Sequence, residues 1–380
     1  MWDKLRPLYA LLLLPALLIE IQLAPDVPLR VDAGIHAIAV LLDPLAAGIV
    51  LALYLGVALV YGLDALIVPI LLCSFFLALI FGRSLVKVLA PRPEMLGRLL
   101  AGLYWGLYAI FLVQWASGNA LFGSLFKIGD ANPAPYSILS SEVSFAMDMM
   151  FALAMALVAV GKPRQAVYAA LSYPVLFLFS NAATVVQNML VLGFAAVFIL
   201  LTGRSRLPSF ALYGLLLIVP PVLLVAFSGG ALEVGEYFIY EHGSWRQAGN
   251  ISAIVNAPIF PVDALDYRKV VGEWVFETGN RGWLGWFSSA FSWFPFAFST
   301  LGWVGAGGVG LILLRVIAHG EPWPWRSELA FFACLAVALF SAPKWMTLFP
   351  IMLGIIAQDA IRRRKASVSH PAAEAADNVP

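Results

Sequence analysis

Charged side chains are scarce in this chain, and their scarcity excludes most classes of soluble protein. Lys, Arg, Asp and Glu make up 12% of the 380 residues, whereas 62% are hydrophobic, and the mean hydropathy is +0.89. A chain this apolar does not form an ordinary soluble globular domain. The formal net charge of +1 gives no electrostatic argument for nucleic acid or for another acidic partner.

Cysteines and cofactor motifs are also lacking. The two cysteines, Cys73 and Cys334, lie inside apolar runs, so we expect no disulfide framework. There is no Walker A motif, no Gly-x-Gly-x-x-Gly after a strand, no His-Glu-x-x-His and no Cys/His cluster. ATP hydrolysis, dinucleotide binding and zinc chemistry therefore have no support, and we predict neither a metal nor a cofactor.

Long apolar runs are what the chain has in abundance. Many approach the length of about 20 residues that a membrane-spanning helix needs, so we predict an all-α, polytopic transmembrane helical bundle of about 10–12 spans. The predicted spans are residues 8–23, 34–42, 46–61, 65–81, 99–115, 143–160, 166–179, 184–201, 211–227, 299–317, 328–340 and 347–360. Lys4 and Arg6 put the N-terminus in the cytoplasm. No small-residue cleavage site follows, so we expect the first helix to be retained.

Short basic loops give the orientation of these spans. The loops rich in Lys and Arg all fall on one side of the predicted map, at residues 83–98, 161–165, 203–207 and 362–365. Because such loops stay in the cytoplasm, both termini are predicted to be cytoplasmic.

Two longer loops, residues 117–141 and 232–298, are then external. We predict a single integral-membrane domain over residues 1–366, with short amphipathic helices in the larger loop. A disordered cytoplasmic tail is expected over residues 367–380.

Glu142 stands at the external end of a predicted helix, within Ser140-Ser-Glu-Val-Ser-Phe-Ala146. Ser140 or Ser141 can cap this helix, and a carboxylate in its first turn suits the positive end of the helix dipole. Alternatively, a carboxylate at this boundary acts as a base or anchors a substrate. Both interpretations remain open from the sequence.

Asp148 lies one to two turns deeper in the same predicted helix, with Ser144 on its face. Burying an aspartate in a membrane is costly, which by default marks a functional residue. The alternative is a structural hydrogen bond to Gln187 or Asn188 of another predicted helix. The sequence does not decide between the two.

Arginine in the 232–298 loop is informative, because positive charge favours the inside and an external loop has no topological need for it. Arginine also presents a planar fork of N–H donors that can hold phosphate at two points. Arg246 is the first candidate, together with its neighbours His242, Trp245 and Asn250.

Further candidates are Arg281, in Thr278-Gly-Asn-Arg-Gly-Trp, and Arg268 beside Lys269. The last two fall in residues 263–277, whose apolar spacing also predicts an amphipathic surface helix with a solvated charged face. Asn181, at the polar tip of a predicted helical hairpin, is a further candidate for substrate binding.

Tryptophan and phenylalanine dominate residues 283–298. Such residues at a headgroup boundary usually form an interfacial belt. They can instead line a groove for sugar or lipid, because apolar sugar faces stack on aromatic rings.

These features occur in an order that resembles the Wzy-type bacterial polysaccharide polymerases, which are related to O-antigen ligases. The order is a Ser-Glu-x-Ser-Phe-Ala helix start, an apolar hairpin with a polar tip, and a large external loop that carries arginine. The loop end Arg281-Gly-Trp-Leu-Gly-Trp and the following Thr300-Leu-Gly-Trp-Val-Gly305 resemble the family's Gly-rich stretch before a Leu-Gly-x-x-Gly helix start. The resemblance covers roughly residues 140–313.

The chain also departs from the family pattern. Val143 replaces a common proline, and the hairpin tip reads Ser180-Asn181-Ala-Ala where the family often has Ser-Arg or Ser-Gly. The His-Asn pair expected of ligases is absent near residues 296–300, which favours a polymerase over a ligase.

The resemblance implies a GT-C-like fold and a metal-independent, inverting glycosyltransferase at the periplasmic face of the bacterial inner membrane. The donor would be a glycan on undecaprenyl diphosphate and the acceptor a second lipid-linked repeat unit. Arg246 would stabilise the diphosphate leaving group, and Glu142 or His242 would deprotonate the attacking hydroxyl. The residues expected to bind substrate are Arg281, Arg268, Asp148, Asn181, Trp245 and Asn250.

Membrane lipids, a flippase and chain-length regulator proteins are the expected partners. Three alternatives remain: ligase-like transfer to another acceptor, a polysaccharide or lipid transporter in which Asp148, Gln187 and Asn188 form a polar path, and a non-enzymatic export subunit.

Overall fold

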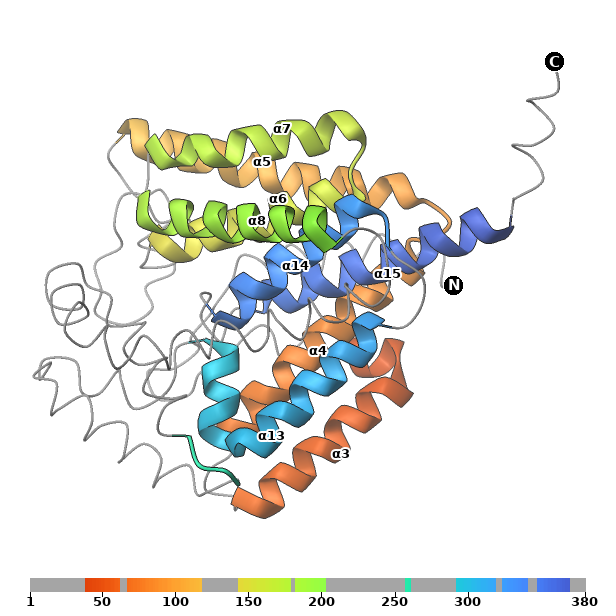
Figure 1. Cartoon of the computed structure of the whole chain (residues 1–380). Coiled ribbons are helices and arrows are strands. Elements are labelled where there is room, and N and C mark those ends of the chain that lie inside the picture. Colours follow the sequence, from red (N-terminus) through yellow and green to blue (C-terminus); the bar gives the residue numbers. More distant parts are fainter. Residues whose placement is uncertain are drawn as a thin grey trace, which may run out of the picture.

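The computed structural model describes residues 38–61, 67–117, 143–178, 182–202, 257–260, 292–318, 323–340 and 347–369, and every regular element in them is helical. The helices are α3 (Pro44–Tyr61), α4 (Ile67–Val88), α5 (Pro93–Ser117), α6 (Val143–Val160), α7 (Pro163–Val175), the 3-10 turn η2 (Leu176–Leu178), α8 (Ala182–Thr202), α13 (Trp293–Ala318), α14 (Trp325–Phe340) and α15 (Leu348–Ser369). The predicted all-α class is confirmed for these residues (Figure 1).

One helix of the described set, α5, is long and apolar enough to cross a membrane. The apolar stretches Met147–Val160 of α6 and Thr184–Val197 of α8 are shorter. By length and composition, α5 is therefore the span that these residues support.

Helix α6 is the centre of the fold. Residues 147–160 are all buried, and α5, α7, α8, α14 and α15 all pack against this helix. A helix that is apolar around its whole circumference is expected to be enclosed in this way. Its observed bounds are the ones that the sequence predicts.

Helices α14 and α15 connect two groups of helices (Figure 1). The first group contains α5, α6, α7 and α8, and the second contains α3, α4 and α13. Helix α15 packs on both α4 and α6, and α14 packs on both α6 and α8. The core is therefore continuous from one group to the other.

The crossing of α4 and α15 depends on two glycines. A Cβ atom built on Gly82 would overlap the carbonyl oxygen of Ile351, and one built on Gly354 would overlap the carbonyl oxygen of Leu79. Small residues allow helix backbones to approach this closely, as at many helix interfaces in membranes.

Asp43 separates the short helical segment at residues 38–42 from α3. Its carboxylate accepts a hydrogen bond of 3.3 Å from the backbone N–H of Ala46, and Pro44 occupies the first helical position. This is a typical helix N-cap followed by proline. Asp43 also pairs with Lys87, near the end of α4, at 3.2 Å.

Two helices extend beyond the predicted bounds. Helix α13 begins at Trp293, within the last residues of the predicted 232–298 loop. Helix α15 continues through Ser369, past the predicted start of a disordered tail at residue 367. The predicted spans 8–23 and 211–227 lie outside the described residues, whereas Cys73 and Cys334 are both free and buried, as expected.

Candidate functional site

Most of the predicted site residues lie outside the part of the chain that the structure describes. These are Glu142, Asn181, His242, Trp245, Arg246, Asn250, Arg268 and Arg281. Asp148 is the predicted site residue within it, and the surroundings of Asp148 can be built up atom by atom.

Asp148 lies in α6 with 2% of its surface exposed. The side-chain amide of Asn188, in α8, donates a hydrogen bond of 2.9 Å to Asp148 Oδ1. The hydrogen bond that the sequence allows between Asp148 and Asn188 is thus present. This pairing satisfies a polar group that would otherwise be costly to bury.

Asn188 also joins a third helix to this pair. The same amide nitrogen donates a hydrogen bond of 2.9 Å to the hydroxyl oxygen of Tyr173, in α7. The Tyr173 ring packs edge-on against Phe151 of α6, with ring centroids 5.3 Å apart. One asparagine therefore connects α6, α7 and α8 through buried polar atoms.

A fourth helix contributes through tyrosine. The Tyr104 hydroxyl, in α5, shares a hydrogen bond of 2.8 Å with Ser172 Oγ, next to Tyr173. The Tyr108 hydroxyl donates to the backbone oxygen of Ser172 at 3.3 Å. We refer to Tyr104, Asp148, Ser172, Tyr173 and Asn188 as the polar layer.

The polar layer is closed and well packed, which limits its chemistry. Asp148, Tyr173 and Asn188 are each at most 2% exposed, so a substrate cannot reach them unless the helices separate. Asn188 Oδ1 is a buried acceptor without a hydrogen-bond partner among the described residues. The arrangement is therefore suited to fixing α5, α6, α7 and α8 relative to one another.

Asn188→Leu is expected to destabilise the protein by about 1–3 kcal/mol, because Asp148 and Tyr173 both lose a buried donor. Thermal unfolding of the purified protein in detergent measures this cost. Phe194→Leu, on the exposed face of α8, is the control and should change stability by less than about 0.5 kcal/mol. Equal melting temperatures for the two variants would contradict a structural role for the polar layer.

A second feature with possible function is a break in α13. Gly302 has φ +68°, so the helix is interrupted there. The N–H groups of Trp303 and Val304 donate to the carbonyl oxygens of Pro258 and Ile259, at 3.0 and 3.1 Å. These carbonyls cap the second half of α13. Part of the predicted 232–298 loop is thus bound to the Leu-Gly-x-x-Gly segment.

Glycine is required at this break. A Cβ atom on residue 302 would lie 2.7 Å from the carbonyl oxygen of Pro258, and the positive φ disfavours any other residue. Gly302 is the first glycine of the Leu-Gly-x-x-Gly helix start named in the resemblance. The second half of α13 begins at this residue.

The end of the aromatic run packs in the core and forms neither a belt nor a groove. Trp293, Phe294, Phe296 and Phe298 are all buried. The Trp293 ring lies edge-on to Phe75 of α4, with centroids 4.9 Å apart. For these four residues both predicted roles are wrong, because the helix begins early enough to turn them inward. Residues 283–291 lie outside the described residues.

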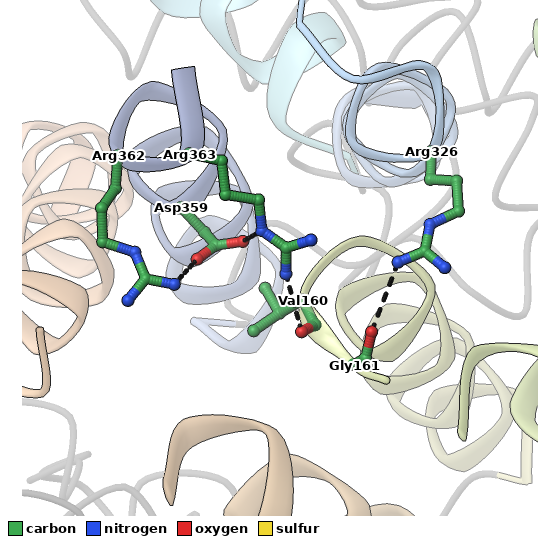
Figure 2. A network of polar contacts seen from close by, with 6 residues as sticks. All are labelled: Val160, Gly161, Arg326, Asp359, Arg362 and Arg363. Atoms are coloured by element: carbon green, nitrogen blue, oxygen red, sulfur yellow. Dashed lines mark hydrogen bonds and ion pairs between the residues drawn. The ribbon is translucent and has the colours of Figure 1, made fainter. Parts of the chain in front are cut away.

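Charged residues gather where α6 ends (Figure 2). Asp359 of α15 is fully buried and pairs with Arg362 at 2.5 Å and with Arg363 Nε at 2.7 Å. Arg363 also donates to the carbonyl oxygen of Val160 at 2.9 Å, and Arg326 of α14 donates to that of Gly161 at 3.3 Å. We call Arg326, Asp359, Arg362 and Arg363 the arginine cluster.

Residues 362–365 are predicted above only as a topology signal, and Asp359 is not among the predicted site residues. The signal was present, because Asp359 precedes Arg362 and Arg363 by three and four residues, the spacing of neighbours on a helix face. Tyr104 and Tyr173 carried no comparable signal, since tyrosines are common in apolar helices. Within the described residues, no three His, Cys, Asp or Glu side chains are grouped as metal ligands.

Comparison of the chain with protein-family models, with curated proteins and with solved structures finds no significant match in any of the three.

Proposed function

We propose that this protein is a polytopic membrane glycosyltransferase that polymerises undecaprenyl-diphosphate-linked repeat units at the periplasmic face of the bacterial inner membrane. This is the activity of the Wzy-type polymerases that the sequence resembles. The support comes from the surface of the helices, from the position of their basic residues and from the anchoring of the large loop.

The surface of the described helices is what a multi-pass protein requires. Helices α3, α7 and α8 expose rows of large apolar side chains, which in water would favour aggregation. Lipid contact accounts for them. The exposed residues include Leu45, Ile49, Leu55 and Leu59 of α3, Val167, Tyr168 and Leu171 of α7, and Leu190, Phe194, Val197 and Leu200 of α8.

Contacts among the basic segments agree with cytoplasmic termini. Arg83 donates to Gln358 at 3.4 Å, and Arg363 and Arg326 bind the end of α6. The Asp43–Lys87 pair joins the start of α3 to the end of α4, as expected if both lie on the cytoplasmic side.

The observation that carries the proposal is the anchoring of the large polar loop at a break in an apolar helix. Residues 257–260 bind the backbone at Gly302, and Trp293 of the same helix touches Phe75, about two turns of α4 before Arg83. This contact places Trp293 about 12 Å along α4 from Arg83, which donates to Gln358, the residue before Asp359. The 18 residues of α6 separate Val143 from the arginine cluster by about 27 Å.

Glu142 immediately precedes Val143 in the sequence, so the proposed reaction uses the end of the protein opposite the arginine cluster. A hydroxyl oxygen of the acceptor attacks the anomeric carbon of the donor, and the bond to the diphosphate oxygen breaks with inversion. Glu142 accepts the hydroxyl proton. Arg246 stabilises the negative charge that develops on the diphosphate.

Arg246→Ala is expected to abolish polymer formation while leaving membrane insertion intact. The test uses purified protein, reconstituted with a lipid-linked oligosaccharide, and resolves the products by chain length on a gel. Arg98→Ala is the matched control, because Arg98 is exposed and pairs with Glu94 at the other end of the protein. Wild-type chain lengths from the Arg246 variant would sink the assignment. No elongation by the wild-type protein would favour a transporter or an export subunit.

Glu142→Gln separates a catalytic base from a helix cap. Glutamine keeps the size of the side chain but cannot take up the proton, so the rate should fall about 10²–10⁴-fold. A role limited to the helix dipole is worth only about 0.3–1 kcal/mol of stability. Initial rates in the elongation assay, with Glu94→Gln as control, measure the difference. Unchanged polymer yield would reduce Glu142 to a capping residue.

A further inference from the structure

The arginine cluster lies at the end of α6 and has no part in the proposed glycosyl transfer. Two arginines from different helices bind consecutive carbonyl groups there, Arg363 that of Val160 and Arg326 that of Gly161 (Figure 2). Carbonyl groups at the end of a helix lack intrahelical partners, and the two arginines supply donors to two of them. The two guanidinium groups are thereby fixed at one helix end.

The two guanidinium groups are held close enough to repel each other. Burial, and then the positive charge of Arg363, lowers the pKa of Arg326, which stands in the first turn of α14 ahead of the predicted span. The backbone oxygens that bind them belong to neighbouring residues of one helix end, so the separation of the two cations is built into the fold. An anion between them would relieve the repulsion.

The surroundings keep an excess of positive charge. Asp359 is shared by Arg362 and Arg363, and Glu328 lies in the same turn of α14 as Arg326. Arg83 reaches the adjacent Gln358 of α15. Four arginines therefore face two carboxylates. Exposed Lys162 and Arg164 follow Gly161 directly and add further positive charge.

We propose that the arginine cluster binds the phosphate of an anionic phospholipid headgroup, held between Arg326 and Arg363. Guanidinium groups bind phosphate oxygens through paired N–H donors. Among the described residues, Arg326 makes a single hydrogen bond, so most of its N–H donors remain for a ligand.

A lipid is the fitting source of this phosphate because the cluster lies at the ends of apolar helices. Basic pockets between helices on the cytoplasmic side of a membrane are suited to anionic headgroups. The inference rests on the membrane embedding given under the proposed function. It does not depend on glycosyl transfer.

Lipid binding can be measured without any glycan. The purified full-length protein is mixed with phosphatidylglycerol or with phosphatidylcholine of the same acyl chains, and retained lipids are counted by native mass spectrometry. The wild-type protein should retain phosphatidylglycerol preferentially. Arg326→Gln should weaken that preference about fivefold, in line with the contribution of one arginine near a membrane surface. Arg98→Gln, at the same basic end of the protein but paired with Glu94, should weaken the preference less than Arg326→Gln does.

Arg326→Lys is a second variant that distinguishes weaker lipid binding from a folding defect. Lysine keeps the charge and can still donate to Gly161, but it lacks the planar fork of N–H donors. The preference of Arg326→Lys for phosphatidylglycerol should therefore fall between those of the wild type and Arg326→Gln. Melting temperatures without added lipid show whether each variant is folded. An equal preference for phosphatidylglycerol in the wild type and both Arg326 variants would overturn the proposal. So would a loss of this preference in Arg98→Gln as large as that in Arg326→Gln. Inorganic phosphate that stabilises the protein as well as phosphatidylglycerol does would overturn the lipid assignment in favour of a free phosphate. Each of these results leaves the elongation assay, and with it the proposed activity, untouched.

Discussion

Gly354→Leu is expected to prevent accumulation of folded protein. At the α4–α15 crossing, a side chain on residue 354 would overlap the backbone oxygen of Leu79 and lie close to the backbone nitrogen of Arg83. Backbone atoms cannot move aside as the tip of a flexible side chain can. We expect a loss of about 3 kcal/mol or more, at the upper end of the usual cost of overpacking.

Gly193→Leu is the matched control for this substitution. Gly193 lies in α8 with nothing near the position of an added Cβ atom. There leucine should be neutral or stabilising by up to about 1 kcal/mol, since glycine is the poorer helix former. Size-exclusion profiles and melting temperatures in detergent report both effects. A monodisperse, wild-type-like Gly354 variant would show that α4 and α15 do not cross as described.

Asp359→Ala is expected to cost about 2–3 kcal/mol. Removing one partner of a buried ion pair usually costs about 3–5 kcal/mol. We expect a smaller loss of stability here because Arg362 and Arg363 are partly exposed, so water can solvate them. Asp359 has no exposed surface, whereas the two arginine side chains are 29% and 37% exposed. The loss of Asp359 also frees Arg363 to leave Val160, which loosens the contact between α15 and α6.

Glu94→Ala provides the comparison for Asp359→Ala. Its partner Arg98 lies four residues away on the exposed face of α5, at 3.3 Å, and such surface pairs contribute about 0.5 kcal/mol or less. Equilibrium unfolding of both variants in detergent should therefore differ by at least about 1.5 kcal/mol. Similar stabilities would mean that the arginine cluster is solvated like an ordinary surface.

Helix α6 was predictable with its bounds because an unbroken apolar run is enclosed by Glu142 on one side and by Gly161-Lys162-Pro163 on the other. Local signals are sufficient in such a case. The start of α13 was not predictable in the same way. Its aromatic residues have only intermediate helix propensity, and the packing of Trp293 on Phe75 is a contact with a helix more than 200 residues earlier.

In the candidate site, too, some features could be predicted from local sequence and others depend on contacts between distant helices. Asn188 could be named as a partner of Asp148, because buried polar groups need partners and few polar residues occur in apolar helices. Tyr104 and Tyr173 could not be named from the sequence. The hydrogen-bond partners of their hydroxyls depend on how α5 and α7 pack against the other helices. The pairing of Gly82 with Gly354 likewise depends on the crossing of two distant helices.

The contact between residues 258–259 and the break at Gly302 tolerates substitution on one side and not on the other. Pro258 and Ile259 supply carbonyl oxygens, which every amino acid possesses, whereas residue 302 can have no side chain at all. The loop is therefore attached through atoms that substitution does not remove. Its side chains can diverge, and with them the glycan that the proposed enzyme accepts, while the attachment point stays constant.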